Sequence, residues 1–464
     1  MKEGLENRQP QVTGTRVSPK RPTTIAPFMS YCAIDFGTSN SSVVVADHHG
    51  GTRLVSLEAG QSTSPTAVFF FTDELEAAQA HGVHRPDGAM PRAYGRAAVA
   101  AYVDGYAGRL MRSLKSILGS SLAEQTTDLG NGYAVRYLDV ITGYLRYLRR
   151  AAEASAQQPL DRLVLGRPVF FVDDDAGRDA RAQATLAAAA QAAGFADVRF
   201  QFEPIAAALD YEQQVAHEQI VLVADIGGGT SDFSVVRVGP EQRLRADRRS
   251  DILASHGVHI AGTDFDRQIE LAALLPLVGF GARGPGGQGA RPVPSNIYHD
   301  LATWHLINTC YRPRRVAEWR AMVDWFAEPE LHRRLMRVLE LRLGHELAAK
   351  TEAAKISACA GAPARVALDA LAPGLAVTVD EALALEAIHA DLERIVEAAV
   401  QTVQAAGLPP ERIDALYLTG GSTGMAPLSG RLSARFATAR TVQGDRLASV
   451  ATGLGVHASR VFGT

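Results

Sequence analysis

Cysteine is scarce in this sequence, and its scarcity is one of several absences that limit what the protein can be. The 464 residues include three cysteines, Cys32, Cys310 and Cys359, which cannot build a disulfide framework and contain no close pair for zinc. Apolar runs such as residues 220–224 are too short to cross a bilayer. Neither charge sign dominates, because 47 basic residues stand against 50 acidic ones, a formal net charge of −3. We therefore expect a soluble protein of a reducing, cytoplasmic compartment, with neither a membrane nor a nucleic acid as partner.

The first 29 residues differ in composition from the rest of the chain. They contain four prolines and almost no periodic apolar pattern, and they lack the apolar centre of a signal peptide. We expect residues 1–29 to form a disordered tail. A transit peptide is the alternative, because acidic residues are few in this stretch.

From residue 30 onward, strand and helix patterns alternate, which is typical of an α/β fold. Hydrophobic residues make up 47% of the chain, enough for a sizeable core. Strands are predicted at 31–35, 42–45, 53–57, 67–71, 163–169, 220–224, 233–238 and 415–418. Helices are predicted around 95–118 and 140–156 and at 176–193, which Gly194 closes. A helical block is predicted from about 330 to 359, then a long helix from a cap at Asp380 to a stop at Gly407, and two more helices before the C-terminus. A turn is predicted at 62–65, between two strands. A flexible Gly/Pro-rich loop at 279–295 has no packable pattern.

One strand-and-turn pattern occurs twice. Residues 35–44 (DFGTSNSSVV) are similar to residues 225–236 (DIGGGTSDFSVV), and their first acids lie 190 positions apart. That separation is the size of a domain rather than of a solenoid repeat. We therefore expect two related α/β units.

The first acid of each copy, Asp35 or Asp225, ends an apolar strand, at the edge of the sheet where α/β proteins bind ligands. A carboxylate is costly to bury there unless it faces a cation or water. Two such acids from duplicated halves suit a hydrated Mg²⁺, which needs only one or two carboxylates. For either acid alone, a solvated turn residue or a helix cap is the alternative interpretation.

Glycine-rich turns follow both acids, and a third turn follows the strand at 415–418. The turns at 37–39, 227–230 and 420–423 combine glycines, whose amide groups can approach phosphate oxygens, with hydroxyls that can donate to them. They are not P-loops, because no Gly-Lys-Ser/Thr follows. A single turn of this kind is weak evidence, but the matched set predicts a phosphate-binding site.

These three turns also resemble known motifs. Residues 34–38 (IDFGT), 225–232 (DIGGGTSD) and 418–423 (LTGGST) resemble the phosphate-1, phosphate-2 and adenosine motifs of the actin-like ATPase superfamily. The segments between them narrow the resemblance to the DnaK-type, 70-kDa heat-shock chaperones. Similar to that family are residues 114–119 (LKSILG), 202–208 (FEPIAAA) and 261–266 (AGTDFD). The resemblance runs in order from about residue 32 to residue 458 and is strongest to the YegD group of the family.

The resemblance implies an actin-like ATPase fold. Such a fold has two lobes, each built on a duplicated ribonuclease H-like α/β unit, with the nucleotide in the cleft between them. The lobes would span residues 30–218 and 219–464. Because residue 464 follows directly on the last helix expected of an ATPase domain, we expect no peptide-binding domain.

The resemblance also implies which residues bind the nucleotide and its metal. Asp35 and Asp225 would hold Mg²⁺ through its waters. The β- and γ-phosphates of ATP would contact Gly37, Thr38, Ser39, Gly227, Gly228, Gly229 and Thr230. The nucleoside would lie against Gly420, Gly421 and Ser422, and its ribose against Glu352 and Lys355.

For catalysis, the resemblance implies that Lys115 positions the attacking water and that Glu203 orients solvent. Asp232 would support the metal site, next to Thr230. Lys115 has no acidic neighbour at helical spacing, so its charge is free to face the cleft. Without the resemblance, Lys115 would be interpreted as a solvated helix lysine and Glu203 as an N-cap ahead of a proline.

The sequence departs from the family where adenine should bind. Two arginines that sandwich the base in the family are replaced by Ile356 and Gly424, and Cys359 replaces a serine near the base. The cation–π component of base stacking is therefore lost. This predicts weaker nucleotide affinity or broader base selectivity.

Together these features predict an ATP-binding, slowly hydrolysing protein of the heat-shock-chaperone family, whose lobes close around ATP or ADP. A nucleotide-gated interaction module without turnover is one alternative, and a small-molecule kinase of the same superfamily is another. A filament-forming relative of actin is more distant. Besides the adenine nucleotide and Mg²⁺, the expected partners are client proteins or a co-chaperone.

Overall fold

The structure is a computed structural model. It describes residues 31–47, 51–72, 90–112, 114–118, 125–130, 133–172, 175–245, 247–286, 290–445 and 448–463. The tail predicted at residues 1–29 lies outside the described residues.

The N-terminal sheet has the strand order β11-β10-β1-β2-β3, with β4 paired to β2. Its strands are β1 (Tyr31–Phe36), β2 (Asn40–Ala46), β3 (Thr52–Leu54), β4 (Thr63–Pro65), β10 (Arg162–Arg167) and β11 (Asp197–Phe202). The central strand β1 runs antiparallel to β2 and parallel to β10. Successive side chains of a strand point to opposite faces, so Cys32, Ile34 and Phe36 enter one core while Tyr31 and Ala33 enter another.

The C-terminal sheet has the strand order β14-β13-β12-β17-β18. Its strands are β12 (Gln219–Ile226), β13 (Ser231–Val238), β14 (Ile252–Val258), β17 (Ala415–Thr419) and β18 (Arg440–Gln443). Here β12 runs antiparallel to β13 and parallel to β17, as β1 does to β2 and β10. The two sheets share one topology, which confirms the duplicated α/β units predicted from the sequence.

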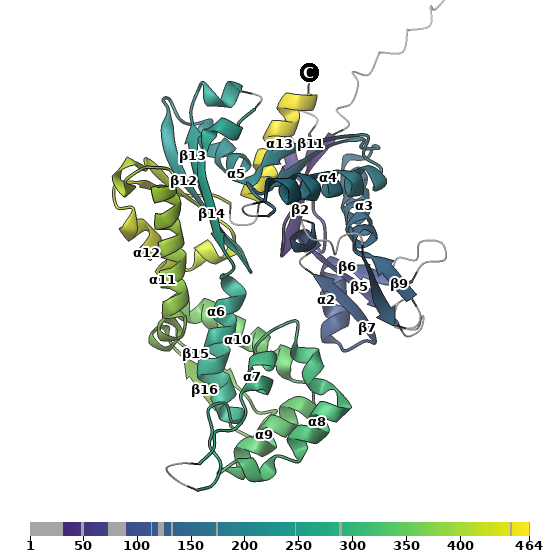
Figure 1. Cartoon of the computed structure of the whole chain (residues 1–464), viewed down its shortest axis with the longest axis vertical. Coiled ribbons are helices and arrows are strands. Elements are labelled where there is room, and N and C mark those ends of the chain that lie inside the picture. The colour runs from purple at the N-terminus through teal and green to yellow at the C-terminus, as the bar shows by residue number, and fades with distance from the viewer. Residues whose placement is uncertain are drawn as a thin grey trace, which may run out of the picture.

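Helices cover the outer face of each sheet (Figure 1). On the N-terminal sheet these are α3 (Tyr137–Ala156) and α4 (Ala176–Ala192), and on the C-terminal sheet α11 (Glu381–Ala405) and α12 (Ala426–Arg435). The predicted helix boundaries hold where capping chemistry is strong. Asp380 caps α11 by accepting a hydrogen bond from the amide of Leu383, while Gly194 and Gly407 follow α4 and α11 with positive φ.

Two helices link the halves of the molecule. α5 (Glu203–Glu212) and α13 (Ser449–Phe462) pack against each other between the two sheets (Figure 1). The last helix, α13, packs on β1, β2 and β10 of the N-terminal sheet, whereas α5 reaches β12 and β13. Contacts therefore cross the lobe boundary predicted between residues 218 and 219. The helix α5 precedes the boundary and contacts C-terminal strands, whereas α13 follows it and contacts N-terminal strands.

Each unit carries further elements beyond its main sheet, in the lower part of Figure 1. The N-terminal unit adds α2 (Gly95–Val103), β5 (Ala67–Phe71), β6 (Arg92–Tyr94), β7 (Gly108–Arg112), β8 (Thr126–Gly130) and β9 (Tyr133–Arg136). The C-terminal unit adds α6 (Gly262–Ile269), α7 (Asn296–Leu301), α8 (Pro313–Arg320), α9 (Pro329–Glu340), α10 (Gly344–Cys359), β15 (Ala364–Ala367) and β16 (Ala376–Val379).

Three sequence predictions are wrong in detail. The helix predicted at 95–118 ends at Val103, because Gly105 takes a left-handed φ of 77° and the chain continues as β7 and a short 3₁₀ helix, η1 (Leu114–Ile117). The turn predicted at 62–65 contains β4, which pairs with β2.

The loop predicted at 279–295 is also packed in its described part. Arg283 and Pro292 form an antiparallel bridge, and Val293 is buried in the core of the C-terminal unit. The guanidinium of Arg291 lies 4.6 Å from the ring centroid of Trp325. Two of its partners, Trp325 against Arg291 and Ala327 against Arg283, lie more than 30 positions away along the chain, so no local pattern predicts these contacts.

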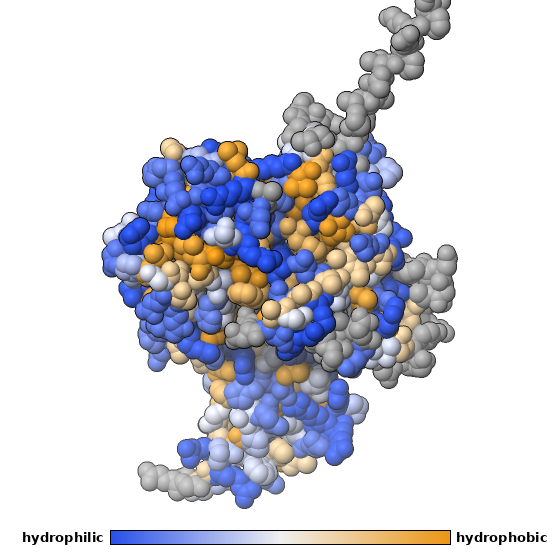
Figure 2. Space-filling view, turned by 45° about the horizontal axis from the view of Figure 1, so that its top comes forward, coloured by the Kyte–Doolittle hydropathy of each residue, from blue (hydrophilic) through white to orange (hydrophobic). Residues whose placement is uncertain are grey.

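In the described part of the chain, no helix combines the length and the apolar composition needed to cross a membrane. Figure 2 shows hydrophilic residues over most of the face drawn, with the hydrophobic ones gathered in its upper part.

Candidate active site

The three glycine-rich turns predicted to bind phosphate follow β1, β12 and β17. Asp225 pairs in register with Thr419 of the parallel strand β17, so the turns after these two strands are direct neighbours. Across the other edge, Asp225 pairs with Asp232 of β13, just as Asp35 pairs with Ser42 of β2. The second copy of the pattern thus carries one more carboxylate than the first.

A threonine that belongs to none of the sequence motifs stabilises the first turn, at 37–39. Thr66 donates a hydrogen bond from its hydroxyl to the carbonyl of Gly37 (2.8 Å) and from its amide to the carbonyl of Ser39 (2.9 Å). A Cβ atom on Gly37 would lie 2.2 Å from the carbonyl oxygen of Asn40. The turn therefore requires glycine at this position.

The second turn, at 227–230, is held by two other segments of the C-terminal unit. The amide and the hydroxyl of Thr263 both donate to the carbonyl of Gly228 at 2.8 Å. Ser422 donates from its hydroxyl to the carbonyl of Gly227 at 2.7 Å. The two turns face each other, since a Cβ on Gly228 would lie 3.3 Å from Ser39 Oγ.

Glycine is also required where the third turn begins. Gly420 has φ +86°, and a Cβ there would lie 2.4 Å from the carbonyl oxygen of Ile226 and 2.6 Å from Asp225 Oδ1. Gly421 follows as the first residue of a short 3₁₀ helix and is exposed. The third turn therefore lies directly against the end of β12.

A buried ion pair stands beside these turns. Lys115, on η1, lies with its Nζ 2.6 Å from Glu203 Oε1, and both side chains are largely buried. Glu203 is the first residue of α5, where Pro204 suits the start of the helix. The N-cap is Phe202 and no side chain caps the helix, so the alternative interpretation of Glu203 as a cap is wrong. Its carboxylate is instead committed to Lys115.

The carboxyl groups around this ion pair lie close enough to raise one another's pKa. Burial raises the pKa of Asp35 to about 8, and the Glu203 carboxylate adds to the rise while the Lys115 ammonium opposes it. Burial, followed by the charges of Asp232 and Glu203, raises the pKa of Asp225 to about 7. Burial alone would lower the pKa of Lys115, but the carboxylates of Glu203 and Asp35 raise it instead. One ammonium group thus stands among four carboxylates.

This crowding of carboxyl groups fits a divalent cation, whose charge would favour their ionised forms. Within the described residues, no group of three or more His, Cys, Asp or Glu side chains is arranged to bind a metal directly. Carboxylates that come together without forming a direct ligand cage suit Mg²⁺, which retains several of its waters. Asp35 and Asp225 are therefore chemically suited to hold a hydrated Mg²⁺.

A cavity of about 180 Å³ opens beside these carboxylates. It is lined by Glu203, Asp225, Thr230 and Asp232, and Thr230 donates a hydrogen bond from its hydroxyl to Asp232 at 2.9 Å. Further lining residues come from two segments outside the motifs that the sequence analysis singles out. These include Phe170, Phe171, Ser255, His256, Gly257 and His259.

Gly257 is the one of these residues whose presence has a clear steric reason. It pairs in register with Asp232, and a Cβ on it would lie 2.5 Å from Asp232 Oδ1. A glycine here lets the carboxylate of Asp232 lie over β14. Only the pairing of β13 with β14 reveals this, so no local signal in the sequence could have found it.

The residues predicted to bind the nucleoside lie on α10 and after β17. Glu352 is exposed, whereas Lys355 is buried with its Nζ 2.7 Å from Asp266 Oδ1 and 3.2 Å from the carbonyl oxygen of Gly262. Ile356, at one position of the missing arginine clamp, is 60% exposed. A ribose contact by Lys355 stays a prediction, and in this structure its ammonium group binds Asp266.

Two sheets of one topology, with acid-bearing turns at the ends of their central strands, define an actin-like ATPase fold. Residues 31–271 match the Hsp70 protein family, and the chain belongs to that family. It is 29% identical over 243 residues to the chaperone protein DnaK of Mycoplasmoides gallisepticum, covering 51% of this chain and 34% of that protein. It is 30% identical over 241 residues to the DnaK of Ureaplasma parvum serovar 3, covering 51% and 33%. The match thus spans about a third of the length of these curated relatives, and membership of the YegD group stays a prediction.

Proposed function

We propose that this chain binds ATP and ADP with a hydrated Mg²⁺ between its lobes and slowly hydrolyses ATP to ADP and phosphate. The observation that carries the proposal is the Lys115–Glu203 ion pair, 2.6 Å long, in electrostatic contact with Asp35 and Asp225. Phosphoryl transfer depends on positioning the reacting groups and on stabilising the charge of the phosphate. A lysine beside carboxylates and glycine-rich turns provides groups for both.

The protein groups would divide the work by chemistry. Asp35 and Asp225 would accept hydrogen bonds from the waters of Mg²⁺, which when bound supplies positive charge to the phosphates. Amide groups of the turns at 37–39 and 227–230 would donate to phosphate oxygens. Lys115 would orient the attacking water, and Glu203 would hold the lysine in position and orient solvent. Thr230 and Asp232 would complete the wall beside the phosphate.

We further propose that nucleotide binding closes the lobes. The two phosphate turns belong to different sheets, so a nucleotide bound to both would draw the sheets together. At the far end of the molecule, Tyr102 of α2 and His345 of α10 already meet around Trp304, with ring centroids 5.0 to 5.2 Å apart. This aromatic contact joins the two units and would limit how far they open.

A nucleotide-gated module without turnover is the second candidate. The exposure of Ile356 and the lack of a side chain at Gly424 favour it, because the base would be held weakly on that side. Client proteins or a co-chaperone would be the partners in either case. The described cysteines, Cys32, Cys310 and Cys359, are buried free thiols, which supports a reducing, cytoplasmic compartment.

The test is Asp225→Asn, measured by calorimetry with ATP in the presence and absence of Mg²⁺. The variant removes one charge from a crowded group of carboxylates, so we expect it to fold normally and to lose about 10–100-fold in Mg²⁺-dependent affinity. Asp324→Asn is the matched control, because Asp324 is exposed on the C-terminal unit far along the chain from the turns. Unchanged Mg·ATP affinity in Asp225→Asn would remove the metal assignment.

A further inference from the structure

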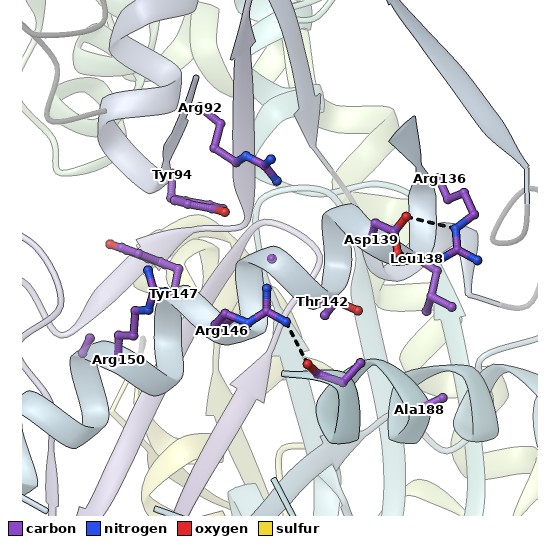
Figure 3. A pocket seen from close by; sticks show the side chains of 13 residues that line it. Arg92, Tyr94, Arg136, Leu138, Asp139, Thr142, Arg146, Tyr147, Arg150 and Ala188 are labelled. Carbon is purple, nitrogen blue, oxygen red and sulfur yellow. Dashed lines mark hydrogen bonds and ion pairs between the residues drawn. The ribbon is translucent and has the colours of Figure 1, made fainter. Parts of the chain in front are cut away.

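A second pocket lies on the outer side of the N-terminal unit, away from the glycine turns. It has a volume of about 630 Å³ and lies between α3, α4 and β6 (Figure 3). This volume is within the range of small-molecule sites, which are mostly apolar with a few convergent polar groups. Nothing in the proposed function uses it.

One face of α3 supplies most of the wall. Asp139, Gly143, Arg146, Tyr147 and Arg150 recur at three- and four-residue spacing, which places them along a single stripe of the helix. Opposite them α4 presents only alanines, Ala188 and Ala192, so the groove between the two helices stays open. The alanine-rich composition of α4 therefore creates the space.

The charge of the pocket is strongly positive. Arg92, Arg136, Arg146 and Arg150 line it, against the single acid Asp139. Asp139 is engaged by Arg136 through two hydrogen bonds of 2.9 Å. Within the described residues, no carboxylate lies at ion-pair distance from Arg92, Arg146 or Arg150. These three guanidinium groups therefore lack a counter-charge among the residues that the structure describes.

Neighbouring groups orient the side chains of Arg146 and Arg92. Arg146 donates to the carbonyl of Ala192 at 2.8 Å, and Figure 3 shows its guanidinium and that of Arg92 approaching the same space from opposite sides. Gly143 leaves that space open, since a Cβ on it would lie 3.1 Å from the Tyr94 hydroxyl and 3.7 Å from Arg92 Nη1. A glycine inside a helix costs about 1 kcal/mol relative to alanine, and here it makes room for these two groups.

A flat apolar wall adjoins the charged groups. The rings of Tyr94 and Tyr147 stack at 5.0 Å with an interplanar angle of 11°. Leu138 and Ala151 extend the apolar lining. Arginine binds phosphate with paired hydrogen bonds, and three uncompensated guanidinium groups suit a doubly charged phosphate better than a singly charged carboxylate.

We propose that this pocket binds an aryl phosphate group, with the phosphate among Arg92, Arg146 and Arg150 and the ring against the tyrosines. The site is separate from the nucleotide cleft and does not depend on the proposed ATPase activity. The same chemical group occurs in free phosphate esters and in phosphotyrosine side chains of peptides. The test must therefore distinguish these two sources.

The experiment compares phenyl phosphate, inorganic phosphate, benzoate and phenol by calorimetry on the full chain, with and without saturating Mg·ADP. We expect phenyl phosphate to bind at least about ten-fold more tightly than each of the others, in both conditions. A pentapeptide with a central phosphotyrosine is the further arm: tighter binding of the peptide assigns a protein source, and weaker binding assigns a free ester. Equal binding of phenyl phosphate and inorganic phosphate would overturn the proposal.

Variants can distinguish binding in this pocket from nonspecific electrostatic attraction of anions to the protein. Arg150→Gln should weaken the binding of phenyl phosphate about ten-fold, the loss expected for one charge-assisted hydrogen bond. Arg150 is exposed and forms no ion pair with the described residues, so we expect the variant to fold normally. Ala188→Phe, at an exposed position of α4, should fill the pocket and abolish binding of phenyl phosphate. Arg181→Gln, which removes the same charge from an exposed site on α4 outside the pocket, should change the affinity by less than about two-fold. An equal loss in Arg181→Gln and Arg150→Gln would contradict the site.

Discussion

The candidate site has a predicted phosphate end, formed by the glycine-rich turns, and a predicted base end, at Ile356 and Gly424. The two ends differ in the contacts that shape them. At the phosphate end, Thr66, Thr263 and Ser422 each donate hydrogen bonds to carbonyl groups of the glycine turns. At the base end, Ile356 is 60% exposed and Gly424 offers no side chain. The predicted phosphate end is fixed by backbone geometry, whereas the predicted base end lacks the two arginine side chains that the family resemblance implies there.

This difference indicates where nucleotide affinity should come from. Backbone amides and a hydrated cation recognise phosphate whatever base is attached, whereas cation–π stacking recognises the base. We therefore expect affinity to depend on the phosphates and Mg²⁺, with little discrimination between ATP and GTP.

The largest effect should follow from a change at the phosphate end. Lys115→Ala removes the only cation that is in electrostatic contact with Asp35 and Glu203 within the described site. Hydrolysis should fall by about 10²-fold or more, because a misplaced reacting water costs that much, while nucleotide affinity falls far less. Single-turnover phosphate release and calorimetry measure the two quantities separately.

Lys350→Ala is the matched control for Lys115→Ala, since Lys350 pairs with Glu346 on the surface of α10. It should leave both rate and affinity unchanged. Equal losses of rate and affinity in Lys115→Ala would make Lys115 a binding residue only.

The next effect concerns Gly420, the first residue of the third glycine-rich turn. Gly420→Ala would place a Cβ 2.4 Å from the carbonyl of Ile226 in a left-handed conformation, so we expect a loss of about 2–3 kcal/mol in the free energy of unfolding. Gly229→Ala is the control for stability, because nothing lies within 4 Å of its Cβ position. Denaturant unfolding of both variants measures the difference, and equal stability would contradict the described packing.

A smaller effect should come from rebuilding the base end. Ile356→Arg with Gly424→Arg should tighten ATP by about 1–2 kcal/mol, the size of partly desolvated cation–π contacts. GTP should gain less, so competition between the two nucleotides measures the change. No gain in the double variant would mean that the base is held by other groups.

The smallest expected effect is a difference in stability between variants at the two phosphate turns, 37–39 and 227–230. Thr66 is buried, so Thr66→Val removes the hydroxyl that donates to the carbonyl of Gly37 and forms a hydrogen bond with the hydroxyl of Ser41, and it should cost about 1 kcal/mol of stability. Thr263 is exposed, so water can replace its hydroxyl and Thr263→Val should cost less than about 0.5 kcal/mol. Thermal unfolding of the pair would contradict this comparison if Thr263→Val were the more harmful.

The sequence predicts best what short segments determine. The duplicated strands around Asp35 and Asp225, the cap at Asp380 and the glycine at 407 depend on neighbours within a few positions. Local chemistry is enough to place such features. The same holds for Gly420, whose turn follows its strand directly.

Long-range contacts account for most of what the sequence analysis missed. Thr66 reaches Gly37 across 29 positions, and α13 returns to the N-terminal sheet from the end of the chain. The ion pair of Lys115 with Glu203 spans 88 positions, so a search for acids at helical spacing could not find it. The basic pocket joins residues 92 to 192 and has no sequence motif.

The most direct test of the central claim is release of phosphate from ATP by the wild-type chain, with no acceptor added, in the presence and absence of Mg²⁺. We predict slow formation of ADP and phosphate in equal amounts, dependent on Mg²⁺. Tight binding of Mg·ATP with no release of phosphate would contradict the hydrolysis claim, and failure to bind Mg·ATP would contradict the nucleotide site itself.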